Sequence, residues 1–279
     1  MKNNKLLKAL SIVSVSVLSL GMFAGCGTSN STSEVTSNEV DTNQEEVKDN
    51  NTNVKDDNVI IMGTNAEFEP FEYRENGMDI VGFDVEIAEK VAEKMGKELV
   101  IEDMAFDSLI MALNSDKIDF IAAGMTATDE RRTQVDFSES YFHSKQMIIV
   151  KADDTSITTA DDLVGKNVGV QLGTTGDLFV SATEGIASVA QFQTGTQAVM
   201  DLKNGKVDAV VIDAEPAKKM TEGQSDLKLL DAPFVEEEYA IAVKKGNDEV
   251  LQAINETLTD IQANGTYDEI YAKYFGTAE

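Results

Sequence analysis

Short apolar runs alternate with amphipathic segments from residue 59 onward. Val59–Met62 is apolar throughout and Ile118–Ala122 is apolar except at Asp119, as expected of strands buried on both faces. Between them, Asp84–Met95 has helical periodicity, and Gly96 is placed to end the helix. The apolar positions on its buried face are Ile87, Ala88, Val91, Ala92 and Met95. This alternation of strands and helices predicts an α/β fold with a parallel sheet.

A short helix is predicted just before the strand at Ile118, followed by a weak internal repeat. Leu109, Ile110 and Leu113 are its apolar positions, and Asp107 is the expected N-cap. The stretch Leu113-x-x-x-Lys117-Ile118-Asp119 recurs as Leu202-x-x-x-Lys206-Val207-Asp208, 202 − 113 = 89 residues later. Each copy reads as a helix end, a turn and a buried strand. The repeat supports two lobes, but such units are common and chance similarity stays open.

The first copy leads into a pair of arginines. Thr128 is the expected N-cap of a helix whose first turn contains two acidic residues and then Arg131 and Arg132. In open α/β sheets, ligands bind beyond the carboxyl ends of the strands, where an arginine matches a carboxylate with two hydrogen bonds. The alternative is that both arginines lie on a solvated helix face.

The second copy leads into an acidic residue. Its strand, Val207–Ile212, ends at Asp213, and Glu215-Pro216 predicts a helix with Pro at its first position. The first copy therefore places a cation beyond its strand, and the second copy places an anion there. A zwitterion needs both groups.

A Gly-Thr-rich turn lies between the two copies. Residues 168–177, VGVQLGTTGD, predict a strand, a turn and a helix start. Consecutive N–H groups in such a turn can form a small anion-binding nest, although a plain strand–helix turn is the alternative. Neither the GxxxxGK[ST] nor the GxGxxG phosphate motif is present.

The N-terminus predicts export and lipid attachment. Three lysines precede an apolar stretch, Leu10–Leu20, that is too short to span a membrane as a mature helix. Phe23-Ala24-Gly25-Cys26 follows and resembles the lipobox of bacterial lipoproteins, which implies a signal peptide over 1–25 and lipidation, with palmitate, at Cys26. An incidental cysteine after an ordinary signal peptide is the alternative. Residues 26–58 are polar and acidic, and predict a disordered tether.

Charge and composition exclude several classes of function. The net charge is −27, with 50 acidic and 23 basic residues, which disfavours nucleic acid as a partner. His143 is the single histidine and Cys26 the single cysteine. These counts predict no catalytic triad, no metal site and no cofactor.

Six motifs, in order, resemble the extracellular solute-binding proteins of family 3, the amino-acid-binding lipoproteins of ABC transporters. They are GTNAEFEPFEY, VGFDVEIAEKVAEKMG, the run FDSLIMALNSDKIDFIAAGMTATDERR with DFSESY, DLVGKNVGVQLGTTGD, GKVDAVVIDAEPA and NGTYDEIYAKYFG. The resemblance implies a two-lobed periplasmic-binding-protein-like fold of type II, with a ligand cleft between the lobes. Lobe 1 would combine 59–144 with 239–279, and lobe 2 would be 145–238, with a crossing near Glu236–Tyr239 and a closing helix at Gly265–Phe275.

The resemblance also implies the ligand contacts. Arg131 would hold the α-carboxylate with the backbone N–H groups of Thr126 and Thr175. The α-ammonium would be held by Asp213, the Gly124 carbonyl and the Thr126 hydroxyl. Phe68 and Phe106 would sandwich the ligand side chain, whereas Phe71 and Tyr73 are expected to pack inside the protein. Asn65 and Gln171 would set side-chain preference.

The resulting prediction is a non-enzymatic, lipid-anchored protein that captures a polar amino acid for an ABC permease. It would be a monomer on the outer face of the cell membrane. Asn65 and Gln171 are uncharged, which favours a neutral ligand over lysine unless another acid such as Glu67 contributes. The alternatives are an enzyme on the same fold, such as a cyclohexadienyl-type dehydratase using Glu67, and a ligand-sensing domain.

Overall fold

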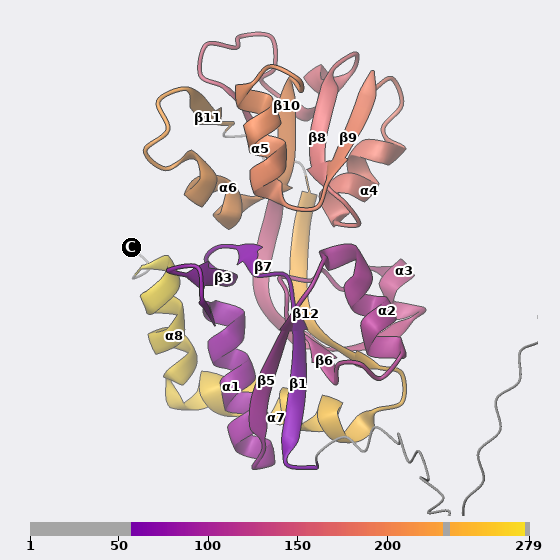
Figure 1. Cartoon of the computed structure of the whole chain (residues 1–279), viewed down its shortest axis with the longest axis vertical. Helices are drawn as coiled ribbons and strands as arrows, with labels where there is room; N and C mark the ends of the chain where they lie inside the picture. The colour runs from indigo at the N-terminus through magenta and orange to yellow at the C-terminus, as the bar shows by residue number, and fades with distance from the viewer. Residues whose placement is uncertain (1–56, 231–234, 277–279) are drawn as a thin grey trace, which may run out of the picture. The chain divides into compact units, whose positions relative to one another are not determined.

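A computed structural model describes residues 57–230 and 235–276 of the chain (Figure 1). The predicted signal peptide, Cys26 and almost all of the predicted tether lie outside these residues. Within them, no helix is long and apolar enough to cross a membrane.

One mixed sheet runs through the folded part, in the order β5-β1-β6-β12-β7-β10-β8-β9, with β11 paired to β7. Its strands are β1 (Val59–Thr64), β5 (Glu98–Asp103), β6 (Phe120–Ile121), β7 (Val135–Lys151), β8 (Asn167–Gln171), β9 (Ser188–Phe192), β10 (Ala209–Asp213), β11 (Leu227–Leu229) and β12 (Val235–Lys244). A small separate sheet contains β2 (Glu67–Phe68), β3 (Glu72–Glu75) and β4 (Asp79–Val81).

The two ends of the main sheet are parallel, and its centre is antiparallel. β1 pairs in parallel with β5 and β6, and β8 pairs in parallel with β9 and β10. The long strands β7 and β12 pair with each other and with β10 and β6, all antiparallel. The sequence-based prediction of a parallel sheet therefore holds for the ends, which we call lobe 1 (β5, β1, β6) and lobe 2 (β10, β8, β9).

β7 and β12 connect the lobes as a continuous antiparallel pair (Figure 1). Glu237 of β12 lies opposite Ser144 of β7, close to where the sequence predicts the crossings. His143 is exposed on β7, with Nδ1 3.6 Å from a Glu238 oxygen. The exact lobe limits, 59–144, 145–238 and 239–279, stay a prediction, because both strands run on through them.

Helices pack against both lobes and close their cores. In lobe 1, α1 (Phe83–Met95) buries its apolar face and is followed by Gly96, a left-handed C-cap with φ 65°. α8 (Thr266–Phe275) packs aromatic side chains against Phe71 and Phe83, which are fully buried. The helices are α1 (Phe83–Met95), α2 (Leu109–Asn114), α3 (Asp129–Arg132), α4 (Thr175–Ala182), α5 (Gly195–Lys203), α6 (Ala214–Thr221), α7 (Asp248–Asn264) and α8 (Thr266–Phe275), with 3-10 turns at Phe106–Ser108 and Ala160–Leu163.

Three local predictions were wrong in detail. Asp107 does not cap a helix, because it lies inside the 3-10 turn and Ser108 precedes α2. The strand predicted over Ile118–Ala122 is only β6, Phe120–Ile121, since its neighbours pair too briefly to extend it. α6 begins at Ala214, which places Pro216 at the third helical position, where its missing N–H is also tolerated.

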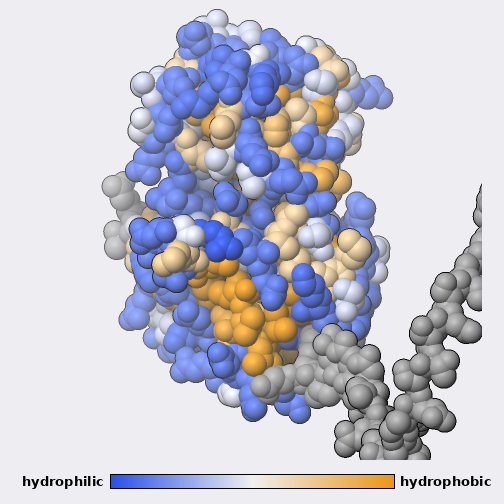
Figure 2. Space-filling model, in the orientation of Figure 1, coloured by the Kyte–Doolittle hydropathy of each residue, from blue (hydrophilic) through white to orange (hydrophobic). Residues whose placement is uncertain are grey.

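The edge strand β5 leaves part of lobe 1 apolar on its surface. Figure 2 shows hydrophobic surface where Figure 1 places β1 and β5. Leu99, Val100 and Ile101 of β5 are half-buried, and charged Glu98, Glu102 and Asp103 flank them. Flanking charges of this kind disfavour pairing with another strand.

Candidate functional site

The ends of four strands bring polar or small residues together where the lobes meet. Asn65 follows β1, and Gly124 comes shortly after β6 in the same lobe. Gln171 ends β8 and Asp213 ends β10 in lobe 2. Carboxyl ends of parallel strands are where open α/β sheets bind ligands, so the fold itself positions this cluster.

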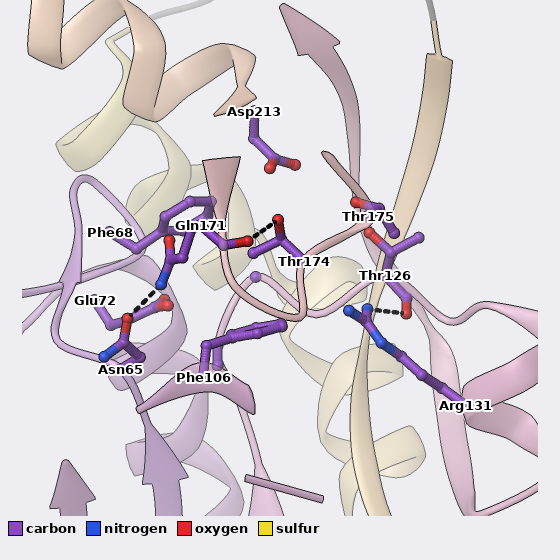
Figure 3. Close-up of a pocket in the computed structure, with 12 residues that line it drawn as sticks. Asn65, Phe68, Glu72, Phe106, Thr126, Arg131, Gln171, Thr174, Thr175 and Asp213 are labelled. Atoms are coloured by element: carbon purple, nitrogen blue, oxygen red, sulfur yellow. Dashed lines mark hydrogen bonds between the residues drawn. The ribbon is translucent and has the colours of Figure 1, made fainter. Parts of the chain in front are cut away.

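All nine residues predicted to bind the ligand line one cavity (Figure 3). The remaining free space in it is about 10 Å³, enough for about one water molecule. The lining is Asn65, Phe68, Glu72, Phe106, Ala123, Gly124, Thr126, Arg131, Gln171, Thr174, Thr175 and Asp213. The structure thus gathers the predicted residues in one place, and it adds Glu72, Ala123 and Thr174, which the sequence analysis did not select.

Arg131 is held in the cavity by its own helix start. The Thr128 hydroxyl caps α3 by accepting from the Arg131 N–H at 3.2 Å, as predicted. Arg131 Nη1 donates to the Thr126 carbonyl at 2.8 Å, and Nη2 donates to the Gly173 carbonyl of lobe 2 at 2.9 Å. Its guanidinium lies 5.3 Å from the centre of the Phe106 ring. Arg131 is 6% exposed, and this burial lowers its pKa, whereas Arg132 is exposed.

Gly124 allows Phe68 to reach the cavity. Its φ is 51°, a left-handed conformation that favours glycine. A Cβ at this position would lie 2.8 Å from a Phe68 ring carbon and 3.3 Å from the Tyr239 ring. The absence of a side chain at residue 124 therefore sets the place of the Phe68 ring.

Asn65 and Gln171 meet across the cleft. Gln171 Nε2 donates to Asn65 Oδ1 at 2.8 Å (Figure 3). It also donates to the Gln193 carbonyl at 3.2 Å. Asn65 Nδ2 donates to the Met104 carbonyl at 2.9 Å. Together with the bond from Arg131 to Gly173, this pair links the two lobes directly through site residues.

Asp213 and Glu237 form a buried acidic pair beside the cavity. Asp213 accepts from Gln146 Nε2 at 2.8 Å and from the Tyr239 hydroxyl. Glu237, on β12, accepts from the Thr126 hydroxyl at 2.8 Å and from Gln146 at 3.3 Å. Burial and the nearby Glu237 raise the pKa of Asp213 to about 8. The raised pKa indicates that the surrounding donors do not balance two negative charges here, a balance that an ammonium group would supply.

A second acidic pair consists of Glu72, which lines the cavity, and Asp84, which does not line it. Glu72 of β3 and Asp84 of α1 are each 1% exposed. Asp84 Oδ2 accepts from the Gly124 N–H at 2.8 Å and from the Tyr141 hydroxyl at 2.7 Å. Burial raises the pKa of Asp84 to about 6, and burial with the Asp84 charge raises the pKa of Glu72 well above its usual range. Glu72 lies beside Asn65 and Gln171 in Figure 3.

Comparison with known proteins identifies the family. The family model for bacterial extracellular solute-binding proteins, family 3, matches residues 60–277. The chain belongs to this family. An arginine-binding extracellular protein of Bacillus subtilis is 37% identical over 77% of this chain and 86% of its own length. The L-cystine-binding protein of Escherichia coli K12 is 30% identical over 78% and 82%.

Solved structures confirm the fold of this solute-binding protein. An ancestral arginine-binding protein, solved with arginine and with glutamine, is 42% identical in both structures, with a TM-score of 0.76. The match covers 78% of this chain and 99% and 98% of those chains. The family resemblance and the two-lobed α/β fold of type II, both predicted from the motifs, are confirmed.

Three acidic or amide residues of this solute-binding protein escaped the sequence analysis. Glu237 lies in the run Glu236–Glu238, and only the middle residue faces inward, in step with buried Tyr239 and Ile241. That period of two was a usable signal. Glu72 offered none, because Phe71 beside it is buried too. Gln146 is placed by its pairing with Asp213 across the sheet. Among the described residues, no group of three or more His, Cys, Asp or Glu could hold a metal ion.

Proposed function

We propose that this solute-binding protein captures a free amino acid with a cationic side chain outside the cell and delivers it to an ABC importer. The observation that carries the proposal is that Arg131, Asp213 and Glu72 line the same cavity, a cation and two separate carboxyl groups that a bound cation would ionise. A basic amino acid carries the complementary set, one carboxylate and two cations.

The α-groups of the ligand fit the side of the cavity where Figure 3 shows Arg131, Thr126, Thr175 and Asp213. Arg131 would bind the α-carboxylate with two hydrogen bonds in place of the carbonyls it now contacts. The N–H groups of Thr126 and Thr175 would assist. Asp213, the Gly124 carbonyl and the Thr126 hydroxyl would bind the α-ammonium.

The ligand side chain would pass between Phe68 and Phe106 toward Glu72. Aromatic faces stabilise both aliphatic stems and cations, and Glu72 offers a buried carboxylate at the far end. Asn65 and Gln171 would exchange their mutual hydrogen bond for bonds to the ligand. This arrangement changes the preference derived from sequence, where the neutral Asn65 and Gln171 favoured a neutral ligand. The name of the Bacillus subtilis relative supports the change, although the Escherichia coli relative is named for cystine.

The N-terminal sequence supports attachment to the outer face of the membrane. Cys26 after a signal-like segment is the proposed lipidation site, and residues 26–58 the tether. Cys26→Ser should release the protein into the medium or leave an unprocessed precursor. A variant of normal mature size in the membrane fraction would contradict the anchor. We further propose a monomer whose membrane partner is the permease.

A thermal-shift screen against the common amino acids tests the ligand class. Ligand at a hundred times its dissociation constant should add about 2.7 kcal/mol to the free energy of unfolding. Arginine, lysine or histidine should give the largest shifts. If calorimetry shows that every neutral amino acid binds more tightly than arginine, lysine and histidine, the cationic ligand is contradicted but amino-acid capture is not.

Enzymatic and sensory roles are separable by experiment. Glu67, the acid that the enzyme alternative relied on, is exposed and does not line the cavity. A binding protein should return its ligand unchanged after prolonged incubation, whereas an enzyme would convert it. A sensor would co-purify with a membrane receptor instead of a permease.

A further inference from the structure

Glu72 and Asp84 lack the hydrogen-bond donors that two buried carboxylates need. Both Glu72 oxygens and Asp84 Oδ1 are buried, and in the described part of the chain no N–H or O–H group donates to them. After burial, Asp84 is the side chain that acts most strongly on Glu72, and both effects raise the pKa of Glu72. Two carboxyl groups can form a hydrogen bond only if one of them carries a proton, so a proton held between Glu72 and Asp84 would supply the missing donor.

Several elements of the fold place acidic side chains around Glu72 and Asp84. No lysine or arginine of the described residues forms an ion pair with Glu72 or Asp84. The titratable groups that face them are Tyr141 of β7, with Tyr267 of α8 behind it, Asp103 of β5 with its partner Arg74, and Asp213 at the end of β10. No positive charge therefore balances the carboxyl groups of Glu72 and Asp84 at this end of the cavity.

We propose that Glu72 and Asp84 share one proton in the free protein, which a cationic ligand side chain expels and a neutral amide side chain retains. The inference rests on the proposed function and extends it, because the same pocket then accepts two classes of side chain. A guanidinium or ammonium group would bind ionised Glu72, and the proton would pass to solvent. A neutral amide would instead accept a hydrogen bond from protonated Glu72, with no proton released.

Side-chain preference then depends on pH. Burial and the facing Asp84 charge raise the pKa of Glu72 well above its usual range, so the proton is retained to a higher pH than on an exposed glutamate. Raising the pH makes expulsion easier, because the released proton enters a solution of lower proton activity. Lowering the pH favours the protonated form that suits an amide. The pocket would thus change from amide preference to cation preference as pH increases.

The test is calorimetry of the full-length chain with L-arginine and L-glutamine from pH 6 to 7.5 at constant ionic strength. Both probes carry the same α-groups, so the ratio of their dissociation constants cancels titration at Asp213. The affinity for arginine relative to glutamine should rise about tenfold per pH unit for one expelled proton. Titrations at pH 7 in buffers of different ionisation enthalpy should show about one more proton released with arginine than with glutamine, because any proton lost from Asp213 is common to both ligands.

Two variants locate the effect. Glu72→Gln keeps a neutral donor in the pocket, so it should weaken arginine binding, retain glutamine binding and make the ratio independent of pH. Glu67→Gln removes an exposed acid that does not line the cavity, and it should keep the ratio and slope of the parent. Thermal melts establish whether each variant is folded. If Glu72→Gln does not fold, the number of protons released by the parent protein decides whether the shared proton exists.

The possible failures are distinguishable. A ratio that is flat with pH, equal proton release by both ligands, or an unchanged slope in folded Glu72→Gln would overturn the shared proton alone. If glutamine does not bind, the shared proton would be overturned by arginine binding that releases no proton from the protein. If neither amino acid binds at any pH, the proposed function falls and this inference falls with it.

Discussion

At the level of single residues, the site combines groups placed by local structure with groups placed by pairing between distant strands. Arg131 was predictable because Thr128, three positions earlier, caps its helix. Asp213 was predictable because it ends a strand. Gln146 and Glu237 reach the site only because β7 and β12 pair with particular registers, and register is set by contacts far apart in sequence.

Adjacent Arg131 and Arg132 give a matched pair for testing the site. Arg131→Ala would leave a bound carboxylate desolvated without its partner, a cost of about 2–5 kcal/mol. Binding of the amino acid found in the screen should weaken by about 30-fold to several thousand-fold, at 1.4 kcal/mol per tenfold. Arg132→Ala should change little, because Arg132 is exposed and its guanidinium lies over Phe137, outside the cavity.

Calorimetry on both arginine variants decides the assignment. Normal binding by Arg131→Ala together with weak binding by Arg132→Ala would contradict the carboxylate contact. Weak binding by both would indicate that α3 as a whole, and not the one guanidinium, determines affinity.

At the level of elements, the weak sequence repeat corresponds to one geometry built twice. The N–H of Lys117 donates to the Ala112 carbonyl, and the N–H of Lys206 donates to the Asp201 carbonyl, at 3.0 and 2.9 Å. The third residue after each leucine, Asp116 and Gly205, is left-handed in both copies. Both helices therefore end with the same hydrogen-bonded turn before the strand.

The equivalence extends to the neighbouring strands. Asp119 Oδ2 accepts from the Ile61 N–H and Asp208 Oδ2 accepts from the Asn167 N–H, both at 2.8 Å. Each aspartate thus fixes its strand against the strand beside it, β1 or β8. The sequence showed the aspartates at the same spacing, but their partners lie too far away in the chain to be read from it.

Gly124 tests how an element positions the site. Gly124→Ala adds a left-handed penalty of about 1–2 kcal/mol and a Cβ contact at 2.8 Å to Phe68. We expect lower stability in urea unfolding and weaker ligand binding. Gly165→Ala is the control, because Gly165 is also left-handed and its Cβ would meet nothing within 4 Å. It should lose stability by the backbone penalty alone and bind normally. Equal binding by both variants would contradict the role of Gly124.

At the level of the whole molecule, the sequence predicted two lobes and a crossing, and the structure adds how they are held. Arg131 with Gly173 and Asn65 with Gln171 join the lobes through the groups that the ligand would use. The same free space of about 10 Å³ means that an amino acid can enter only if these contacts open. Binding then replaces contacts between the lobes by contacts of both lobes with the ligand. Because the ligand contacts both lobes only when they are closed around it, binding favours the closed state.

The buried acids also determine how stability should depend on pH. Folding raises the pKa of Asp84 from 3.8 to about 6 and that of Asp213 from 3.8 to about 8, and it raises the pKa of Glu72. Between pH 4 and 8 the folded protein therefore binds more protons than the unfolded chain. The change in the free energy of unfolding with pH is proportional to the number of protons bound by the unfolded chain minus the number bound by the folded protein. This slope is therefore negative between pH 4 and 8.

The ligand-free protein should accordingly lose stability as pH rises from 5 to 8. Each of these groups contributes a slope of at most about 1.4 kcal/mol per pH unit, because one proton is the most it can release. Acids whose pKa folding lowers, such as Asp162 at about 2, are ionised in both states above pH 5 and add no slope. Urea unfolding at constant ionic strength measures the effect.

Asp213→Asn removes one of the buried acids, so the slope of its stability with pH should be shallower than the parent's. Its stability relative to the parent should be greatest near pH 8. A parent whose stability rises over this range, or an Asp213→Asn variant with the parent's slope, would show that these acids are already ionised in the folded protein.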